Sequence, residues 1–122
     1  MLRSQLSLIV RGIVVVALAF SCGIALAESD AESANSVTPG CHSLIDGNND
    51  TDRSIQGFCL GIVATLEIWG GVGKFICAPK GVTRLQMIRV VVQYIDNRPA
   101  RMHERFDLLA LEAMKAAWPC KP

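Results

Sequence analysis

The chain has 122 residues, a formal net charge of +1 at pH 7 and 51% hydrophobic residues. This length is sufficient for one domain. A charge so close to balance argues against nucleic acid as the main partner.

The first 27 residues have the pattern of a secretory signal peptide. Arg3 and Arg11 precede a continuous apolar run that ends in Ala25-Leu26-Ala27, a small-x-small site of the kind signal peptidase cleaves. The apolar run has about 15 residues, whereas a membrane-spanning helix needs about 20, so we expect cleavage after Ala27 rather than a retained anchor. A lipoprotein modified at Cys22 is a weaker alternative, because the residues before it do not form a lipobox.

Cleavage there leaves four cysteines, an even number that in an exported chain indicates two disulfides. A domain of this size buries a small share of its surface, so its core benefits from cross-links. Zinc is the rival interpretation, but the sequence has no C-x-x-C motif, and His42 and His103 are not at ligand spacing. We therefore expect no metal and no other cofactor. The four cysteines are Cys41, Cys59, Cys77 and Cys120.

The exported chain begins with a polar segment that lacks periodicity. We expect residues 28–37 to be a flexible lead-in and residues 38–122 to form the domain. A short helix should follow the lead-in, with Thr38 as its N-cap and Pro39 at its first position. The polar stretch at residues 47–52 is predicted to be a loop.

Residues 54–69 are mostly apolar and are predicted to form a buried helix, since the run is too long for one strand. Asp52 is placed to cap its N-terminus. Gly57 and Gly61 lie on one face of this helix, where we expect the backbone of another helix to approach closely. Glycines after Trp69 are expected to end the helix.

Two start signals predict the next helix, from residue 83 to about residue 96. Thr83 and Gln86 form a capping box, and Val82 and Met87 occupy the positions of a hydrophobic staple. Apolar residues then recur at spacings of three and four. These signals outweigh the β-branched run that follows, which mildly favours a strand.

A last helix is expected to open at Pro99 and to end at Trp118. The turn between the last two helices is short, so they should pack as an antiparallel hairpin. The predicted fold is therefore a small all-α domain of three long helices and one short helix.

The hairpin favours one of the three possible disulfide pairings. It places the start of one helix beside the end of the other, which brings Cys77 to Cys120. Cys41 is then left to bond with Cys59.

No residue is predicted to be catalytic, and we expect the protein not to be an enzyme. Bridged cysteines supply no thiolate, and no base lies next to an orienting partner. We expect His42, in a turn, and His103, on a charged helix face, to be solvated. Glu67 is interpreted as a helix-end carboxylate in contact with solvent, and Trp69 and Trp118 as packing residues.

The charged residues are unevenly placed along the chain. Those between residues 28 and 52 are acidic, whereas those between residues 74 and 105 are mostly basic. Such a run is commonly a solvated face, but it also suits a docking surface, because arginine pairs with carboxylates through two nitrogens. The candidate partner-binding residues are Arg84, Arg89, Arg98, Arg101 and Arg105.

Three motifs in this order, QGFCLGIV, FICAPKGVTRLQMIRVVVQYIDNRPARMHE and ALEAMKAAWPC, carry a family resemblance. Together they are similar to the Rap/Tai family of bacterial immunity proteins, over residues 41–120. Two features depart from the family pattern: Arg105 stands where many members have proline, and the spacer between the first two cysteines is longer. The motif residues carried over are structural: Cys59, Gly61, Cys77, Pro79, Gly81, Val82, Thr83, Gln86, Pro119 and Cys120.

The resemblance implies an exported helical protein that protects a bacterium from a type VI secretion effector. The effectors that such proteins neutralise are notably peptidoglycan amidases delivered into the periplasm. The implied partner is a secreted toxin, bound without turnover, and a homodimer is a further possibility. The alternatives are a periplasmic acid-stress chaperone and an orphan structural protein.

Overall fold

A computed structural model describes residues 30–122, so the predicted signal segment lies outside the described residues. The all-α class is confirmed: the described part contains helices and no strand, only an isolated bridge between Ser33 and Arg105. The helix that we predicted to be short has 13 residues, as many as α4. In chain order the elements are η1 (Asp30–Glu32), α2 (Ala34–Asp46), α3 (Arg53–Val72), α4 (Arg84–Asp96), η2 (Pro99–Arg101) and α5 (Phe106–Ala117).

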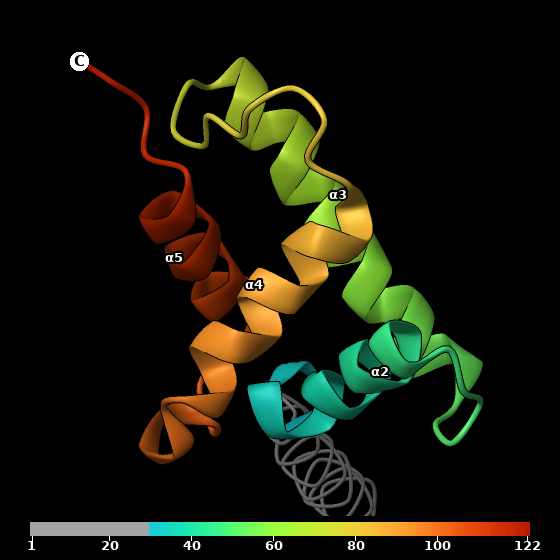
Figure 1. Cartoon of the computed structure of the whole chain (residues 1–122). Helices are drawn as coiled ribbons and strands as arrows, with labels where there is room; N and C mark the ends of the chain where they lie inside the picture. The colour runs from blue at the N-terminus through green and yellow to red at the C-terminus, as the bar shows by residue number, and fades with distance from the viewer. Residues whose placement is uncertain (1–29) are drawn as a thin grey trace, which may run out of the picture.

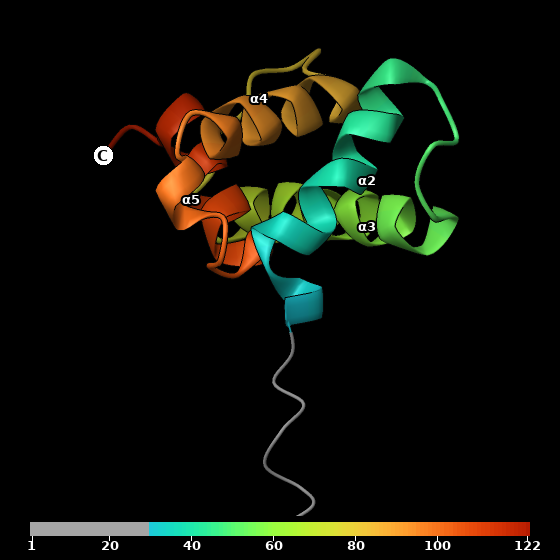
Figure 2. The same cartoon turned by 90° about the horizontal axis from the view of Figure 1, so that it is seen from below.

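Helix α4 lies between α3 and α5 in Figure 1, and α2 crosses the end of the molecule where α3 begins. Turned by 90°, α4 lies above α3, and α2 and α5 extend between these two levels (Figure 2). The most extensive helix contacts join α2 to α3 and α4 to α5. The core between them is formed mainly by α4 and α5, with Ile88, Ile95, Phe106, Leu109 and Met114 among its largest fully buried side chains.

Helix α2 begins earlier than the sequence predicted. Ser33, not Thr38, is the N-cap, and its hydroxyl accepts a hydrogen bond from the Ser36 N–H. The N–H of Ala34 donates to the Glu104 carbonyl at 2.9 Å, a contact between distant parts of the chain. The prediction of a flexible lead-in is therefore wrong for residues 33–37.

Two residues predicted to start α2 lie inside it instead. Pro39 stands in the second turn, where it lacks the N–H that would bond to the carbonyl four residues before. Thr38 is buried, and its hydroxyl has no hydrogen-bond partner within residues 30–122. The left-handed Gly47, with φ of 67°, ends the helix as glycine commonly does.

Helix α3 starts where predicted. The Asp52 carboxylate accepts hydrogen bonds from the N–H of Ser54 at 2.7 Å and from its hydroxyl at 2.8 Å. These bonds, the backbone one most of all, lower the pKa of Asp52. The helix runs three residues beyond Trp69 to Val72, because the first two glycines continue it and Gly73 caps it.

The close backbone approaches occur at glycines other than those predicted. A Cβ on Gly57 or Gly61 would meet no atom within 4 Å, so no helix in the described part packs there. In contrast, a Cβ on Gly40 would lie 2.7 Å from the backbone of Ile55. A Cβ on Gly70 would lie 2.6 Å from the side chain of Ile76.

The two C-terminal helices begin differently. The Thr83 hydroxyl accepts from the Gln86 N–H at 3.1 Å, which confirms the predicted start of α4. Pro99 opens only the 3₁₀ turn η2, so the prediction that it opens the last helix is wrong. Helix α5 begins at Phe106, after Arg105 as N-cap, and ends before Trp118.

The disulfides have the pairing that the hairpin argument predicts. Cys41 bonds to Cys59, with a Cα–Cα distance of 5.5 Å, and ties α2 to α3. Cys77 bonds to Cys120, with a Cα–Cα distance of 4.9 Å. The Cys77 N–H also donates to the Trp118 carbonyl at 2.9 Å, so the segment before α4 is fixed to the segment after α5.

Candidate partner-binding surface

Helix α3 is the most apolar helix of the described part, yet 11 of its 20 residues are exposed. Only Cys59, Val63 and Gly70 are buried in it. The prediction of a buried helix is therefore wrong: one side packs on the rest of the domain and the other faces outward. We call the exposed side the α3 outer face, which consists of Gly57, Phe58, Leu60, Gly61, Thr65, Ile68, Trp69 and Val72.

The apolar exposure is greatest in the C-terminal half of the α3 outer face. Ile68, Trp69 and Val72 are 58%, 64% and 71% exposed. Phe75, just after the helix, is also exposed. Apolar side chains gathered in this way mark a protein or membrane contact more often than a bare surface.

The α3 outer face is also uncharged. The two charged residues of the helix are Arg53, at its first position, and Glu67. Glu67 lies at the edge of this face, seven positions after Leu60, where its carboxylate pairs with the Arg84 guanidinium of α4 at 2.9 Å. An uncharged apolar centre with charges at its border is the usual composition of a protein–protein interface core.

By length and composition, α3 is the one helix of residues 30–122 that meets the criterion for crossing a membrane. The same helix is bonded to α2 through Cys59 and packs against α2, α4 and α5. A helix held on one side by a folded domain presents its other side as a surface. We therefore treat the α3 outer face as a contact surface for a partner.

Arg101, one of the predicted contact residues, is the centre of an internal ion-pair network. Its guanidinium donates to both oxygens of Glu104, at 2.8 and 2.7 Å, and to both oxygens of Glu112, at 2.7 and 3.0 Å. The Tyr94 hydroxyl donates to Glu112 as well, at 2.9 Å. These hydrogen bonds lower the pKa of both carboxyl groups and raise the pKa of Arg101.

The other four arginines do not form one free basic surface. Arg84 pairs with Glu67, and Arg98 stacks over the Tyr94 ring at 3.6 Å. Arg105 pairs with Asp107 at 2.8 Å and lies 3.9 Å from Glu32. Arg89 is exposed and has no ion pair with any residue from 30 to 122. Most of the predicted basic surface is thus engaged within the chain.

The Arg101 network makes stability depend on pH. Because the pKa values of Glu104 and Glu112 are lowered on folding, their contribution is present above the ordinary value of 4.5 and is lost as pH falls through the folded values. We expect the melting temperature of the natural protein to fall on acidification more steeply than that of the Arg101→Gln variant. In the variant, Glu104 and Glu112 repel each other without a cation between them. Protonation in acid removes this repulsion and so offsets part of the loss of stability.

Circular dichroism melts between about pH 6 and pH 3 check this pH dependence. The matched control is Arg89→Gln, which removes an arginine without an ion pair in the described part. Its pH profile should follow that of the natural protein. Parallel profiles for Arg101→Gln and the natural protein would show that the network has no such effect.

The remaining polar and aromatic candidates fall at scattered places. His42 lies in α2 rather than in a turn and pairs with Asp96 at 3.1 Å. His103 is exposed, in the turn after η2 rather than on a helix face. Trp118 is half-buried against the core, as predicted, whereas Trp69 is not a packing residue of this domain. Within residues 30–122, no group of His, Cys, Asp or Glu is placed to hold a metal.

The α3 outer face was missed at the sequence level because apolar composition alone indicates burial. The one signal for it is a line of small or polar residues, Gly57, Gly61 and Thr65, at spacings of four. This line interrupts the apolar surface of a helix that would otherwise be apolar all round. It lies at the centre of the exposed side.

A small helical domain with two cross-links and an uncharged apolar face has the features of a protein that binds another protein. A family model described as Rap1a immunity proteins matches residues 17–120. The match covers most of the chain, including all four bonded cysteines, so the chain belongs to the Rap1a immunity protein family. Comparisons with curated proteins and with solved structures give no match.

Proposed function

We propose that this protein neutralises a secreted effector by binding it through the α3 outer face, without turnover of its own. Membership of the Rap1a immunity family supports a secreted effector as the partner. The observation that carries the choice of surface is the exposure of Ile68, Trp69 and Val72 on an uncharged side of α3. Immunity then consists of occluding the effector.

The proposal places this action in the periplasm, after removal of residues 1–27. The pattern of the N-terminal segment and the pairing of the remaining cysteines support export to an oxidising compartment. The resemblance to the Rap/Tai family supports a type VI secretion effector, with a peptidoglycan amidase or related hydrolase as the expected class. No cofactor takes part in this scheme.

The expected anchor of the complex is Trp69. Tryptophan is enriched among the residues that dominate binding energy, and such residues lie near the centre of a patch that excludes water. Ile68 and Val72 extend the apolar contact along the helix. At the border of this face, Arg53 and Lys74 are exposed cations that suit the polar rim of an interface.

A second copy of the chain is the alternative occupant of the α3 outer face. Gly57, Gly61 and Thr65 are small and exposed, so two α3 helices could cross there with their backbones close together. If a homodimer used this face, it would have to dissociate before the effector could bind there, or the effector would have to bind another surface. Sedimentation of the protein without effector tests this alternative: a dimer in the natural protein that becomes a monomer in the Trp69→Gln variant would place the second copy on this face.

The functional test is protection from a periplasmic toxin. Cells that export a candidate effector encoded in the same genome should lyse, and co-expression of this protein with its N-terminal segment should prevent lysis. The purified pair should also form a stable complex. Failure of every encoded effector to bind, combined with suppression of aggregation at low pH, would favour an acid-stress chaperone. Inactivity in both assays would favour an orphan structural protein.

A further inference from the structure

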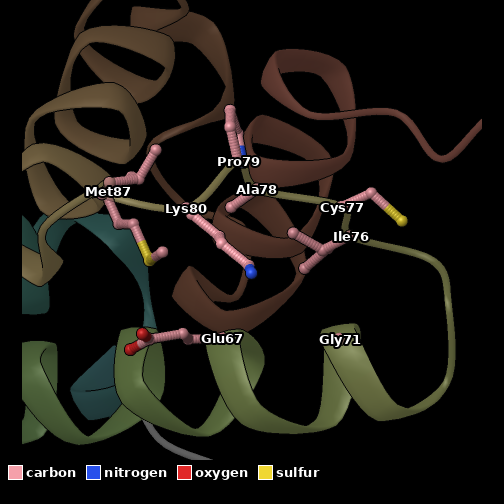
Figure 3. Close-up of a pocket in the computed structure, with 10 residues that line it drawn as sticks. Glu67, Gly71, Ile76, Cys77, Ala78, Pro79, Lys80 and Met87 are labelled. Carbon is pink, nitrogen blue, oxygen red and sulfur yellow. The ribbon is translucent and has the colours of Figure 1, made fainter.

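A groove lies between the C-terminal half of α3 and the loop that leads into α4. It has a volume of about 520 Å³, within the range of pockets that bind small ligands or single peptide segments. Figure 3 shows this loop passing over α3, with side chains from both elements directed into the gap. Glu67 and Gly71 line the groove, and the residue that follows each of them, Ile68 and Val72, belongs to the α3 outer face. The groove therefore adjoins the α3 outer face.

The base of the groove is apolar and open. Ile76 and Met87 lie beneath the groove and are almost fully buried, whereas the half-buried Ala78 and Val82 present apolar surface to it. A Cβ on Gly71 would meet no atom within 4 Å, so this glycine leaves space where another residue would project. An aliphatic side chain of a ligand therefore has both a contact surface and room.

The charges at the groove leave a positive excess. Glu67 is directed into the gap, but its Oε2 is neutralised by the Arg84 guanidinium at 2.9 Å. Lys80 extends from the loop into the same gap (Figure 3). It is exposed and has no ion pair with any residue that the structure describes. A carboxylate on a ligand would give Lys80 a partner, whereas a cation would be repelled.

The loop also offers backbone donors at the lip of the groove. Within residues 30–122, no hydrogen bond engages the N–H groups of Ala78, Lys80 or Gly81. The Val82 N–H bonds to the Pro79 carbonyl at 3.3 Å and holds the turn. Free N–H groups beside a lysine suit a carboxylate or a peptide carbonyl.

We propose that this groove binds an acidic loop of the effector, which would place an aliphatic side chain against Ala78 and Val82, above the buried Ile76 and Met87, and an aspartate or glutamate carboxylate on Lys80. The inference rests on the proposed function, because the groove continues the docking surface and adds selectivity for the partner's sequence. The apolar base fixes where the loop sits, and the lysine selects its charge.

The test uses blocked tetrapeptides and no effector. Acetyl-Ala-Leu-Asp-Ala-amide, titrated into ¹⁵N-labelled natural protein, should shift the amide signals of Gly71, Lys80 and Gly81. Its Asn counterpart should bind about tenfold more weakly, the loss of one ion pair. Lys80→Glu should abolish binding of the Asp peptide, and Gly71→Leu should do so by filling the groove. The matched controls, Lys115→Glu and Ala116→Leu at exposed positions of α5, should bind as the natural protein does.

Three results would overturn the inference. They are equal binding of the Asp and Asn peptides, shifts confined to the α3 outer face, and no binding at millimolar concentration. A third peptide, acetyl-Ala-Leu-Ala with a free carboxyl terminus, addresses the other source of a carboxylate. If this peptide binds and the Asp peptide does not, the ligand of the groove is the C-terminus of a chain and not an acidic loop. The peptide experiment contains no effector, so its failure would not contradict effector binding by the α3 outer face. Conversely, failure of the protection assay would not contradict peptide binding in the groove.

Discussion

Replacing Trp69 by glutamine is expected to weaken binding of the effector on the order of 100-fold and to abolish protection of intoxicated cells. Trp69 is 64% exposed in the free domain, so its burial at an interface removes a large apolar area from water. Glutamine is a good helix former without charge, so α3 should keep its stability. Titration calorimetry with the purified effector gives the affinity, and thermal melts give the stability.

The control for Trp69→Gln is Leu108→Gln. Leu108 is 51% exposed on α5, so the substitution removes a comparable exposed apolar side chain from another surface. We expect its affinity and protection to equal those of the natural protein. Equal affinities for Trp69→Gln and Leu108→Gln would show that the α3 outer face is not the docking surface.

Removing the bridge between Cys77 and Cys120 is expected to lower the free energy of unfolding by about 2–4 kcal/mol. The two cysteines are 43 positions apart, so the bridge restricts a long loop of the unfolded chain. It also holds the segment before α4 against the segment after α5. Urea titration of the double variant Cys77→Ser, Cys120→Ser checks the value.

Lys121→Ser provides the control for the bridge, because this exposed residue next to Cys120 makes no cross-link. Its unfolding midpoint should not change. Peptide mapping without reduction should recover Cys77 joined to Cys120 and Cys41 joined to Cys59. A fragment that joins Cys59 to Cys77 would contradict the hairpin arrangement of α4 and α5.

The features that sequence predicted well depend on residues close together in the chain. The start of α4 is set by Thr83 and Gln86, and that of α3 by Asp52, and in each case the cap bonds to an N–H two or three residues away. The disulfide pairing involves distant residues. It was nevertheless predictable, because two helices joined by a short turn place their outer ends together.

The start of α2 could not be predicted because contacts from a distant segment fix it. The N–H groups of Ala34 and Asn35 donate to the carbonyls of Glu104 and Met102. These bonds order a stretch whose own composition favours disorder. The same segment explains the error at α5, since residues after Pro99 turn toward the start of α2 instead of continuing as a helix.

The candidate site was missed for a related reason. Apolar composition predicts that α3 is removed from water, but it does not say whether its own domain or a partner covers it. In the same way, arginines clustered in the sequence form a basic surface only if the fold brings no carboxylates next to them. Arg101 meets Glu112, 11 positions later, and Arg84 meets Glu67, 17 positions earlier. Such pairs depend on helix packing.

The central claim, that the effector covers the α3 outer face, is tested most directly by ¹⁹F NMR of protein labelled with 5-fluorotryptophan. The chain has two tryptophans, and the half-buried Trp118 serves as an internal reference for the exposed Trp69. In the free protein, the Trp69 signal should shift between H₂O and D₂O, because solvent reaches its ring. Saturation with unlabelled effector should remove that solvent shift and leave the Trp118 signal unchanged. A Trp69 signal that keeps its solvent shift in the saturated complex would contradict the claim.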